Sequence, residues 1–441
     1  MDRATSSHPS VQAQLDRLSR LSPGRDVLGL ERISELLGRL GHPENALPPV
    51  FHVAGTNGKG SACAFLRAAV EAAGLSAHVY TSPHLVRFNE RIRLGGRLID
   101  DEPLAVLLAE ALDAAAGMEI SFFEATTAAA FLAFARQPAD ACIVEVGLGG
   151  RLDATNVIAA PAVCGIAQLG LDHPAFLGDR IERIAIEKAG IAKKGVPLVT
   201  QHYPEAVAEQ VGATAAAVGA VWLPRGARWD ATVHGGRIHY ADRWGEVDLP
   251  LPRLPGLHQA MNAALAVAML RHQSAVDLRD SALKAAMGWA EWPARLQRLA
   301  RGPLLDRLPA GAELWLDGAH NPAAARAAAD FFRARVPAGR PFHILFGLLA
   351  SKDAAGVLRP FRARSLTLHA IPVPGHEHHP PEQLAAAARE AGLNAMASDG
   401  VEEALGWIAR HADRERPPIV LILGSLYLAG EVLEKNGQPP T

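Results

Sequence analysis

Cysteine is scarce in this chain. Only Cys63, Cys142 and Cys164 occur among 441 residues, and they lie in apolar or helical contexts. Their spacing does not match that of a metal site. We therefore expect buried free thiols in a reducing compartment, which predicts a cytoplasmic protein rather than one held together by disulfides.

An excess of charge is missing as well. The formal net charge is −2, which gives no electrostatic reason to expect nucleic acid or a membrane surface as a partner. No apolar run approaches the roughly 20 residues of a membrane span, and Met1–Gln14 is polar and lacks the apolar core of a signal peptide. There is no coiled-coil pattern and no large amphipathic stretch, so we expect a monomer.

The remaining composition, with 49% hydrophobic and 20% charged residues, is that of an ordinary globular protein large enough for two or three domains. From about residue 49, strand-like and helix-like segments alternate, which predicts an α/β fold with a parallel sheet covered by helices on both faces. The strand candidates are 51–54, 77–81, 141–146 and 162–169, and the helix candidates are 61–73, 102–116, 124–135 and 181–192.

Residues 227–252 have a different pattern. Gly235-Gly236 separates two strand-like segments, which predicts a β-hairpin with a two-glycine turn and thus a small antiparallel appendage. Residues 256–272 and 277–289 look helical.

A second α/β pattern, Rossmann-like in its alternation, starts near residue 313. Its strand candidates are 313–316, 342–346, 365–371 and 419–423. Pro303, Pro309 and Gly311 suit a connecting segment. We therefore predict an N-terminal domain over 1–295, a linker over 296–312 and a C-terminal domain over 313–441.

The most informative motif is Val53-Ala54-Gly55-Thr56-Asn57-Gly58-Lys59-Gly60-Ser61, which lies between an apolar run and a helical pattern. A strand, a glycine-rich turn and a helix N-terminus hold nucleotide phosphates, because backbone N–H groups and the helix dipole face them. The lysine reaches the outer phosphates, and a hydroxyl binds Mg²⁺. The common phosphate loop has glycine at position 53 and Ser or Thr directly after the lysine, so this loop is a variant. The expected nucleotide-binding residues are Gly55, Thr56, Asn57, Gly58, Lys59, Gly60 and Ser61.

A second motif is Glu145-Val-Gly-Leu-Gly-Gly-Arg-Leu-Asp-Ala-Thr-Asn156, in which a carboxylate ends a buried strand and glycines follow. A glutamate at the carboxyl end of a parallel strand can hold Mg²⁺ opposite the phosphate loop. The alternative is a strand-end carboxylate that caps backbone amides.

Two further residues have unusual settings. His173, in Gly170-Leu-Asp-His-Pro174, follows the next strand and is a plausible second metal ligand, although a lone histidine is more often structural. Lys188 lies among Ile184, Ala185 and Ile191 on an apolar helix face, and a buried amine is costly unless it is paired or modified. The alternative is a lysine whose amine extends to solvent.

In the second half, Asp317-Gly-Ala-His-Asn-Pro322 ends a strand and begins a helix. Its polar groups are candidates for ligand binding, or equally for a helix-capping turn. Arg295 suits a phosphate, because guanidinium binds phosphate with two parallel hydrogen bonds, although a single arginine is more often a surface residue.

Together these motifs resemble the folylpolyglutamate synthase/dihydrofolate synthase family of the Mur ligase superfamily. The resemblance extends from Leu28-Gly-Leu-Glu-Arg-Ile33 to Gly424-Ser-Leu-Tyr-Leu428. Its most specific segments are Gly55–Ser61, Thr81-Ser-Pro-His-Leu85, Phe88-Asn-Glu-Arg-Ile92 and the Glu145–Asn156 motif.

The resemblance implies an ATP-dependent ligase. A folate-type carboxylate is phosphorylated by ATP, and the amine of L-glutamate then attacks the acyl phosphate. Developing negative charge at the phosphoryl group needs Mg²⁺, Lys59 and the loop amides. The implied partners are small molecules, namely ATP, L-glutamate and dihydropteroate or a reduced folate. Such bacterial enzymes are often bifunctional, which we also expect of this one.

The resemblance also implies site residues. Ser61, Ser82 and Glu145 are expected to bind a first Mg²⁺, and His173 a second. Lys188 matches the lysine that the family carbamylates, which turns a buried cation into a carboxylate-like ligand. The expected catalytic residues are Lys59, Glu145, His173 and Lys188. The remaining expected contacts are Asn262, Arg295, Asp317 and His320 to the nucleotide, and Phe122, Phe123 and Asp153 to the pterin.

The chain departs from the family pattern in its second half. Ala294 stands where glycine is usual, which is tolerable unless the backbone needs a positive φ. Ser351 replaces a common acidic residue, so Lys352 receives no role. His376, His378 and His379 replace a stretch that often carries Pro-Arg, and we expect an exposed loop there rather than a metal site.

Two other classes of function remain open from the sequence. A cell-wall ligase of the same superfamily carries a domain of about 100 residues before the phosphate loop, and 54 residues precede Gly55, too few for one. A nucleotide-dependent switch or binding protein would need neither a second metal nor a buried lysine ligand.

Overall fold

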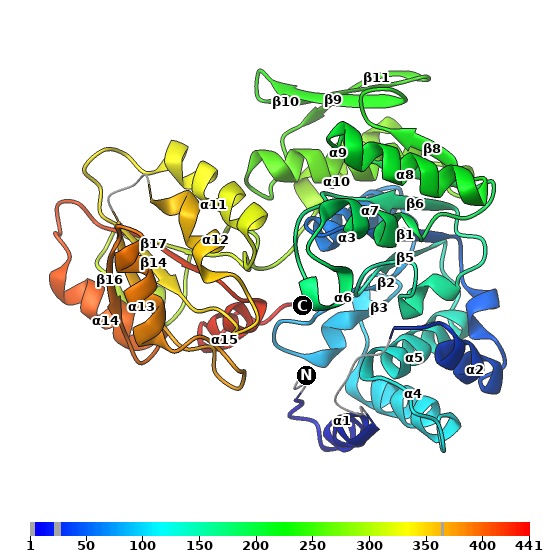
Figure 1. Cartoon of the computed structure of the whole chain (residues 1–441), viewed down its shortest axis with the longest axis horizontal. Helices are drawn as coiled ribbons and strands as arrows, with labels where there is room; N and C mark the ends of the chain where they lie inside the picture. Colours follow the sequence, from blue (N-terminus) through cyan, green and yellow to red (C-terminus); the bar gives the residue numbers. More distant parts are fainter. Residues whose placement is uncertain (1–4, 22–27, 363–365) are drawn as a thin grey trace. The chain divides into compact units, whose positions relative to one another are not determined.

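The computed structural model describes residues 5–21, 28–362 and 366–441. The chain forms two compact units (Figure 1), one of Met1–Arg253 and His258–Glu291 with Thr441, the other of Leu254–Leu257 and Trp292–Pro440. The linker predicted at 296–312 lies inside the second unit, where Gln297–Leu299 forms a strand, β12.

An eight-stranded sheet lies at the centre of the first unit, in the order β4-β3-β2-β5-β1-β6-β7-β8. The strands from β2 to β8 in this order are parallel, and β3 and β4 add antiparallel strands at one edge. Their bounds are β1 Val50–Ala54, β2 Ala77–Tyr80, β3 Ile92–Leu94, β4 Arg97–Leu98, β5 Ala141–Glu145, β6 Val163–Ile166, β7 Pro197–Thr200 and β8 Val221–Pro224.

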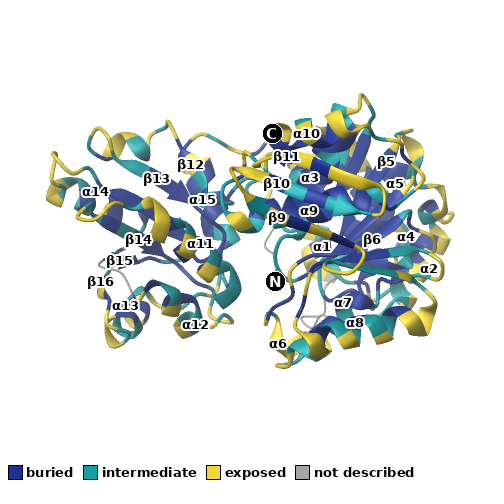
Figure 2. Cartoon of the chain, turned by 90° about the horizontal axis from the view of Figure 1, so that it is seen from above, coloured by how far each residue is buried: buried dark blue, intermediate teal, exposed yellow. Residues whose placement is uncertain are grey.

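Helices cover both faces of this sheet, as the alternating pattern predicted. Every residue of β1, β5 and β6 is buried, as expected of parallel strands packed on two sides; Figure 2 shows β5 and β6 in the dark blue of buried residues. The helices are α1 Pro9–Leu21, α2 Glu31–Arg39, α3 Lys59–Ala72, α4 Asp101–Ala114, α5 Phe122–Arg136, α6 Pro174–Leu177, α7 Ile181–Ala189, α8 Glu205–Val218, α9 Leu257–Arg271 and α10 Asp280–Trp289.

The packing follows from side-chain alternation along the strands. Apolar residues of α5 pack on the face that carries Val50 and Val144, and residues of α7 and α8 pack on the same face near Cys164. On the opposite face, Gly165 lets α9 approach the sheet closely, because a Cβ there would lie 2.2 Å from Met269 Sδ.

The predicted appendage is a three-stranded antiparallel sheet of β9 Trp229–His234, β10 Arg237–Asp242 and β11 Gly245–Pro250. The hairpin between β9 and β10 is confirmed, and its turn residues Gly235 and Gly236 have φ of 56° and 73°, as a two-residue hairpin turn requires. The third strand, β11, was not predicted.

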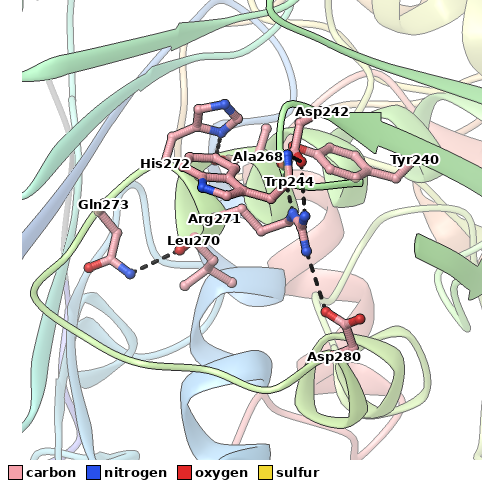
Figure 3. Close-up of polar contacts among 9 residues, drawn as sticks. All are labelled: Tyr240, Asp242, Trp244, Ala268, Leu270, Arg271, His272, Gln273 and Asp280. Atoms are coloured by element: carbon pink, nitrogen blue, oxygen red, sulfur yellow. Dashed lines mark hydrogen bonds and ion pairs between the residues drawn. The ribbon is translucent and has the colours of Figure 1, made fainter. Parts of the chain in front are cut away.

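A buried ion pair anchors this small sheet to the end of α9 (Figure 3). Arg271 donates from Nε (2.7 Å) and Nη2 (2.9 Å) to the two carboxylate oxygens of Asp242. The Tyr240 hydroxyl donates to Asp242 Oδ2 at 3.0 Å. The Asp242 side chain is 0% exposed, so these donors replace the water that the carboxylate loses on folding.

The second unit contains a six-stranded sheet in the order β12-β13-β17-β14-β15-β16, parallel except for β12. The other strands are β13 Glu313–Leu316, β14 Phe342–Phe346, β15 Thr367–Ala370, β16 Asn394–Ala397 and β17 Ile419–Leu423, and the helices are α11 Pro322–Arg335, α12 Ala354–Leu358, α13 Pro381–Glu390, α14 Val401–His411 and α15 Leu426–Lys435. The α/β prediction is confirmed for this unit too.

All three cysteines are buried free thiols, as predicted. Among the described residues, no helix combines the length and the apolar character that a membrane span requires. The segment of β7, α8 and β8 was missing from the sequence prediction, as were β12 and β16.

Candidate active site

The phosphate-loop motif connects β1 to α3 and lies against the end of β6. The backbone N–H groups of Thr56 and Asn57 donate to Gln168 O at 2.8 and 3.2 Å. Thr56 Oγ1 lies 3.0 Å from Gly170 O and 3.1 Å from Gly170 N. The turn is thus held in place by the chain that leaves the neighbouring strand.

Gly58 begins α3 with a left-handed backbone, φ 87°, and it lies against Asn262 of α9. Asn262 Nδ2 donates to Gln259 Oε1 at 3.1 Å, inside the protein. This bond fixes which end of the Asn262 amide faces Gln259. The predicted nucleotide-binding residue Asn262 therefore lies directly beside the phosphate loop.

Lys59, Ser61 and Glu145 meet at the carboxyl ends of β1 and β5. Val53 and Glu145 are partners in the sheet register, which places the Glu145 carboxylate next to the loop. Lys59 Nζ lies 3.9 Å from Glu145 Oε1. Ser61 Oγ is buried and makes no hydrogen bond within the described part of the chain.

These side chains fit a divalent cation. Carboxylate and hydroxyl oxygens are the ligands that Mg²⁺ prefers, and the buried Ser61 hydroxyl would gain the partner that it lacks. Ser82 follows β2, the other neighbour of β5, and is half-buried. The structure therefore brings Ser61, Ser82 and Glu145 to neighbouring positions along one edge of the sheet.

The glycine-rich loop after β5 packs on α7 at Lys188. A Cβ on Gly150 would lie 2.7 Å from Glu187 O and 3.0 Å from Lys188 Cα, so only glycine permits this approach. Arg151 N donates to Glu187 O at 2.7 Å, and Arg151 also forms an ion pair with the Glu187 carboxylate. The loop that begins after Glu145 therefore packs directly on the backbone at Lys188.

Lys188 is 5% exposed, so its amine does not extend to solvent. Burial, together with the positive charge of Lys59, lowers the pKa of Lys188 to about 7, against the opposing effect of Asp172 and Asp153. A large fraction of this amine is therefore neutral and nucleophilic near pH 7. In its protonated form the side chain has only donors and cannot bind a metal.

His173 differs from the other expected ligands because its side chain is 46% exposed. It begins the short helix α6 with φ 51°. Its Nε2 lies 3.9 Å from Asp172 Oδ2. Within the described ranges, no group of three or more His, Cys, Asp and Glu side chains is arranged to hold a metal; the expected ligand sets also include serine hydroxyls and a lysine.

Phe122, Phe123 and Asp153 lie around the same strand ends. A capping box of Ser121 and Glu124 begins α5 and so fixes the two half-buried phenylalanines at its first turn. The Phe123 ring covers Gly147, where a Cβ would lie 2.5 Å from Phe123 Cζ. Asp153 accepts from Leu148 N at 2.8 Å, and burial raises its pKa.

In the second unit, Arg295, Asp317 and His320 form a local cluster. Asp317 accepts from Leu296 N at 2.7 Å and from Ala319 N at 2.8 Å. Burial raises the pKa of Asp317, and the positive charge of Arg295 opposes this rise. His320 Nδ1 lies 2.8 Å from Gly318 O. The motif is thus a tight backbone turn whose carboxylate is held inside the protein.

The departure at Ala294 has a structural cost. Ala294 has φ 54° and is fully buried, which is the positive φ that makes glycine the usual residue. The three histidines of the 376–379 loop have protein partners: the His376 ring stacks on Tyr427, His378 Nδ1 lies 2.7 Å from His376 O, and His379 Nε2 lies 3.0 Å from Lys352 O.

Two residues near this chemistry were missed by the sequence reasoning. Asp172 acts on the pKa of Lys188, and Gln259 orients Asn262. Asp172 lies in the segment quoted for His173, and Gln259 lies in the predicted helix that carries Asn262. Their neighbourhood was therefore the available signal, but only the fold shows which residue each one faces.

Comparison with known proteins gives the family. A model of the Mur ligase glutamate ligase domain matches residues 301–426. Folylpolyglutamate synthase of Lacticaseibacillus casei is 35% identical over 91% of this chain and 92% of its own. The chain belongs to the folylpolyglutamate synthase/dihydrofolate synthase family.

Solved structures of this family have the same fold. E. coli FolC in complex with DHPP and ADP superposes with a TM-score of 0.86 at 32% identity, over 98% of both chains. A bifunctional folylpolyglutamate synthase/dihydrofolate synthase with Mn, AMPPNP and L-glutamate bound gives 0.83 at 31% identity, over 98% of this chain and 99% of that one. The protein is therefore an ATP-dependent ligase, and the comparisons favour the folate branch over a cell-wall ligase or a switch.

Proposed function

We propose that this ligase is bifunctional and adds L-glutamate to dihydropteroate and to reduced folates. A carboxylate oxygen of the acceptor attacks the γ-phosphorus of ATP, and ADP leaves. The glutamate amine then attacks the acyl carbon, an amide bond forms and phosphate leaves. The observation that carries the phosphoryl-transfer step is the convergence of Lys59, Ser61 and Glu145 beside the phosphate loop. The similarity to bifunctional dihydrofolate synthase/folylpolyglutamate synthases supports the two acceptors.

In this proposal two Mg²⁺ ions assist the reaction, and Ser61, Ser82 and Glu145 hold the first. A divalent cation neutralises negative charge on the transferred phosphoryl group. Lys59 and the N–H groups of the phosphate loop act on the same charge. Asn262, Arg295, Asp317 and His320 are further proposed nucleotide contacts. Phe122, Phe123 and Asp153 bind the pterin.

Lys188 is proposed to become a carbamate that, with His173, holds the second cation. Its neutral amine attacks the carbon of CO₂, an N–C bond forms and a proton is lost. Two observations support this step: the amine is buried, and its pKa is about 7. The product is an anion with two acceptor oxygens, which suits a cation site better than a buried amine.

We also propose that the ligase is a monomer and that it acts in the cytoplasm. The three buried free thiols support the reducing compartment.

The first experiment measures phosphate release with Mg-ATP and L-glutamate, comparing 7,8-dihydropteroate with tetrahydrofolate. Turnover with both acceptors is expected. Turnover with only one would overturn the bifunctional assignment, and turnover with neither would overturn the folate acceptor altogether.

The carbamate has a separate test. With ¹³C-bicarbonate, the wild-type protein is expected to give a carbamate carbonyl signal that Lys188→Ala lacks, together with a loss of turnover of about 10²-fold or more. Lys193→Ala is the matched control, because burial also lowers the pKa of this neighbouring lysine. A labelled signal that persists in Lys188→Ala would contradict the assignment.

A further inference from the structure

His52 is a buried histidine that the site described above does not use. It lies in the middle of β1, three residues before Gly55 of the phosphate loop, and is 0% exposed. Its register partners are Val144 of β5 and Cys164 of β6, so the imidazole lies on the sheet face that is packed by apolar side chains. A polar ring in such a position needs a specific partner.

The partner is Thr155, in the loop that follows β5. His52 Nε2 lies 2.8 Å from Thr155 Oγ1, and Thr155 Oγ1 donates to Asp153 Oδ1 at 2.5 Å. A hydroxyl has one proton to donate, and here it goes to the carboxylate. The hydroxyl oxygen must therefore accept from His52, which assigns the proton of the imidazole to Nε2.

The protonation state of His52 agrees with this direction. Burial, with a further contribution from the positive charge of Lys193, lowers the pKa of His52 to about 3. The ring is therefore neutral at physiological pH and has a single N–H. Nδ1 makes no hydrogen bond within the described residues. If the ring were rotated by 180°, a carbon would face Thr155 in place of Nε2, and the Thr155 hydroxyl would lose its donor.

The chain of donors ends on a carboxylate whose two oxygens are both engaged. Oδ1 accepts from Thr155 N at 3.0 Å as well as from the hydroxyl, and Oδ2 accepts from Leu148 N. Gly147 also donates to this carboxylate through its backbone, and Gly147 is the residue that the Phe123 ring covers. Asp153 thus closes the loop onto the aromatic residue proposed for the pterin.

We infer that His52 and Thr155 are positioning residues for the folate acceptor: their hydrogen-bonded chain fixes the rotamer of Asp153 and the shape of the loop that lies against Phe123. This inference rests on the proposed pterin contacts of Asp153 and Phe123. The hydrogen-bonded chain orients Asp153 from behind the edge of the sheet, and neither His52 nor Thr155 touches the substrate. Without the chain, a buried carboxylate would lose a charge-stabilising donor, and its orientation would become less defined.

The test uses pairs of variants in the full-length enzyme. His52→Leu removes the donor, and His52→Gln retains an N–H. Thr155→Val removes the bridging hydroxyl, and Thr155→Ser retains it. The matched control is His78→Leu, because His78 is also fully buried in a strand of this sheet but its Nε2 is bonded to Gln137 O, far along the chain from Asp153.

We expect His52→Leu and Thr155→Val to raise KM for 7,8-dihydropteroate about tenfold, the effect of losing one hydrogen bond to a charged group. KM for ATP should stay within about twofold of wild type. The conservative variants should recover most of the acceptor affinity, and His78→Leu should change the melting temperature but not the acceptor KM. A similar rise in the acceptor KM for His78→Leu, or an equal rise in KM for ATP, would overturn the positioning role.

One more variant separates this inference from the proposed function. If Asp153→Asn leaves the acceptor KM unchanged, the proposed acceptor role of Asp153 is wrong, and the inference falls with it. If Asp153→Asn raises the acceptor KM but His52→Leu and Thr155→Val do not, the acceptor role stands and the hydrogen-bonded chain has no part in it.

Discussion

Gly58 and Asn262 fit together so closely that a methyl group between them is excluded. A Cβ on Gly58 would lie 2.3 Å from Asn262 Oδ1 and 2.9 Å from its Cγ. Asn262 cannot turn away freely, because its amide is hydrogen-bonded to Gln259 inside α9. The close approach of the phosphate loop to Asn262, a proposed nucleotide contact, therefore requires glycine at position 58.

Gly58→Ala should impair nucleotide binding. The new methyl group pushes either the loop or Asn262 out of position, in addition to the strain of a positive φ at a residue with a Cβ. We expect KM for ATP to rise by about tenfold or more. This KM is measured from phosphate-release rates at increasing ATP concentrations.

Gly74→Ala provides the control. Gly74 ends the same helix region with φ 80°, close to the 87° of Gly58, but a Cβ there meets nothing within 4 Å. This variant carries the backbone strain alone, about 1–2 kcal/mol, and should keep the wild-type KM. Equal KM values for the two variants would show that the contact with Asn262 does not matter.

Ala294→Gly is expected to stabilise the protein. Ala294 has φ 54°, and its turn is held by hydrogen bonds from Gly318 N to Ala294 O and from Leu296 N to Asp317. Relief of a left-handed alanine is worth about 1–2 kcal/mol, and the greater freedom of glycine in the unfolded chain offsets about 0.4–1 kcal/mol. The net gain in the free energy of unfolding is about 1 kcal/mol.

Urea unfolding of Ala294→Gly beside Ala328→Gly measures this gain. Ala328 is equally buried, but it lies in the interior of α11, where glycine costs about 1 kcal/mol. Opposite signs are expected for the two variants. Destabilisation of both would mean that the positive φ at residue 294 stores no strain.

The sequence predicted what depends on local pattern and short motifs. The strands that end at Ala54 and Glu145 have apolar runs, and the glycines after them mark the turns, so both motifs fell at the correct edge of the sheet. The two glycines 235 and 236 located a hairpin for the same reason. Strand β11 was not predicted because its alternation of buried Val247 and Leu249 with exposed residues is short, although Gly245, with φ 116°, marks the turn before it.

Other parts of the site depend on contacts between distant segments. Nothing in the sequence near residue 52 indicates that its histidine faces Thr155, 103 residues away. The apolar neighbours of Lys188 made its burial a sensible hypothesis, but the close approach of Gly150 to its backbone comes from tertiary packing. Likewise the sequence shows that alanine stands at position 294 where glycine is usual, but only the fold shows that the backbone there has a positive φ.

The buried ion pair between Asp242 and Arg271 should matter far more than an exposed pair of the same geometry. Asp242→Asn leaves the Arg271 guanidinium with only the exposed Asp280 carboxylate, 3.4 Å away, as an anion, and we expect a loss of about 3 kcal/mol in the free energy of unfolding. Glu110 also accepts two hydrogen bonds from one arginine, Arg136, at 2.7 and 2.6 Å, but its side chain is 40% exposed. Glu110→Gln should cost below about 1 kcal/mol. Similar losses in thermal or urea unfolding would show that burial does not set the difference.

Acid should weaken the second unit through a pair of histidines on neighbouring strands. His343 Nδ1 lies 3.3 Å from His369 Nε2, and the Trp407 ring of α14 packs beside His369. Burial lowers the pKa of both to about 4, whereas unfolded histidine titrates near 6.5. Between these values the unfolded state binds more protons, so stability is retained above about pH 6.5 and lost as the pH falls toward 4. At about 1.4 kcal/mol per pKa unit for each of the two groups, the loss by pH 4.5 should total about 5 kcal/mol. Urea midpoints from pH 7.5 to 4.5 measure this loss.

The double variant His343→Leu/His369→Leu should flatten the dependence of stability on pH over this window, and replacing the exposed His411 by glutamine should not. An unchanged pH dependence in the double variant would assign the acid sensitivity to other groups.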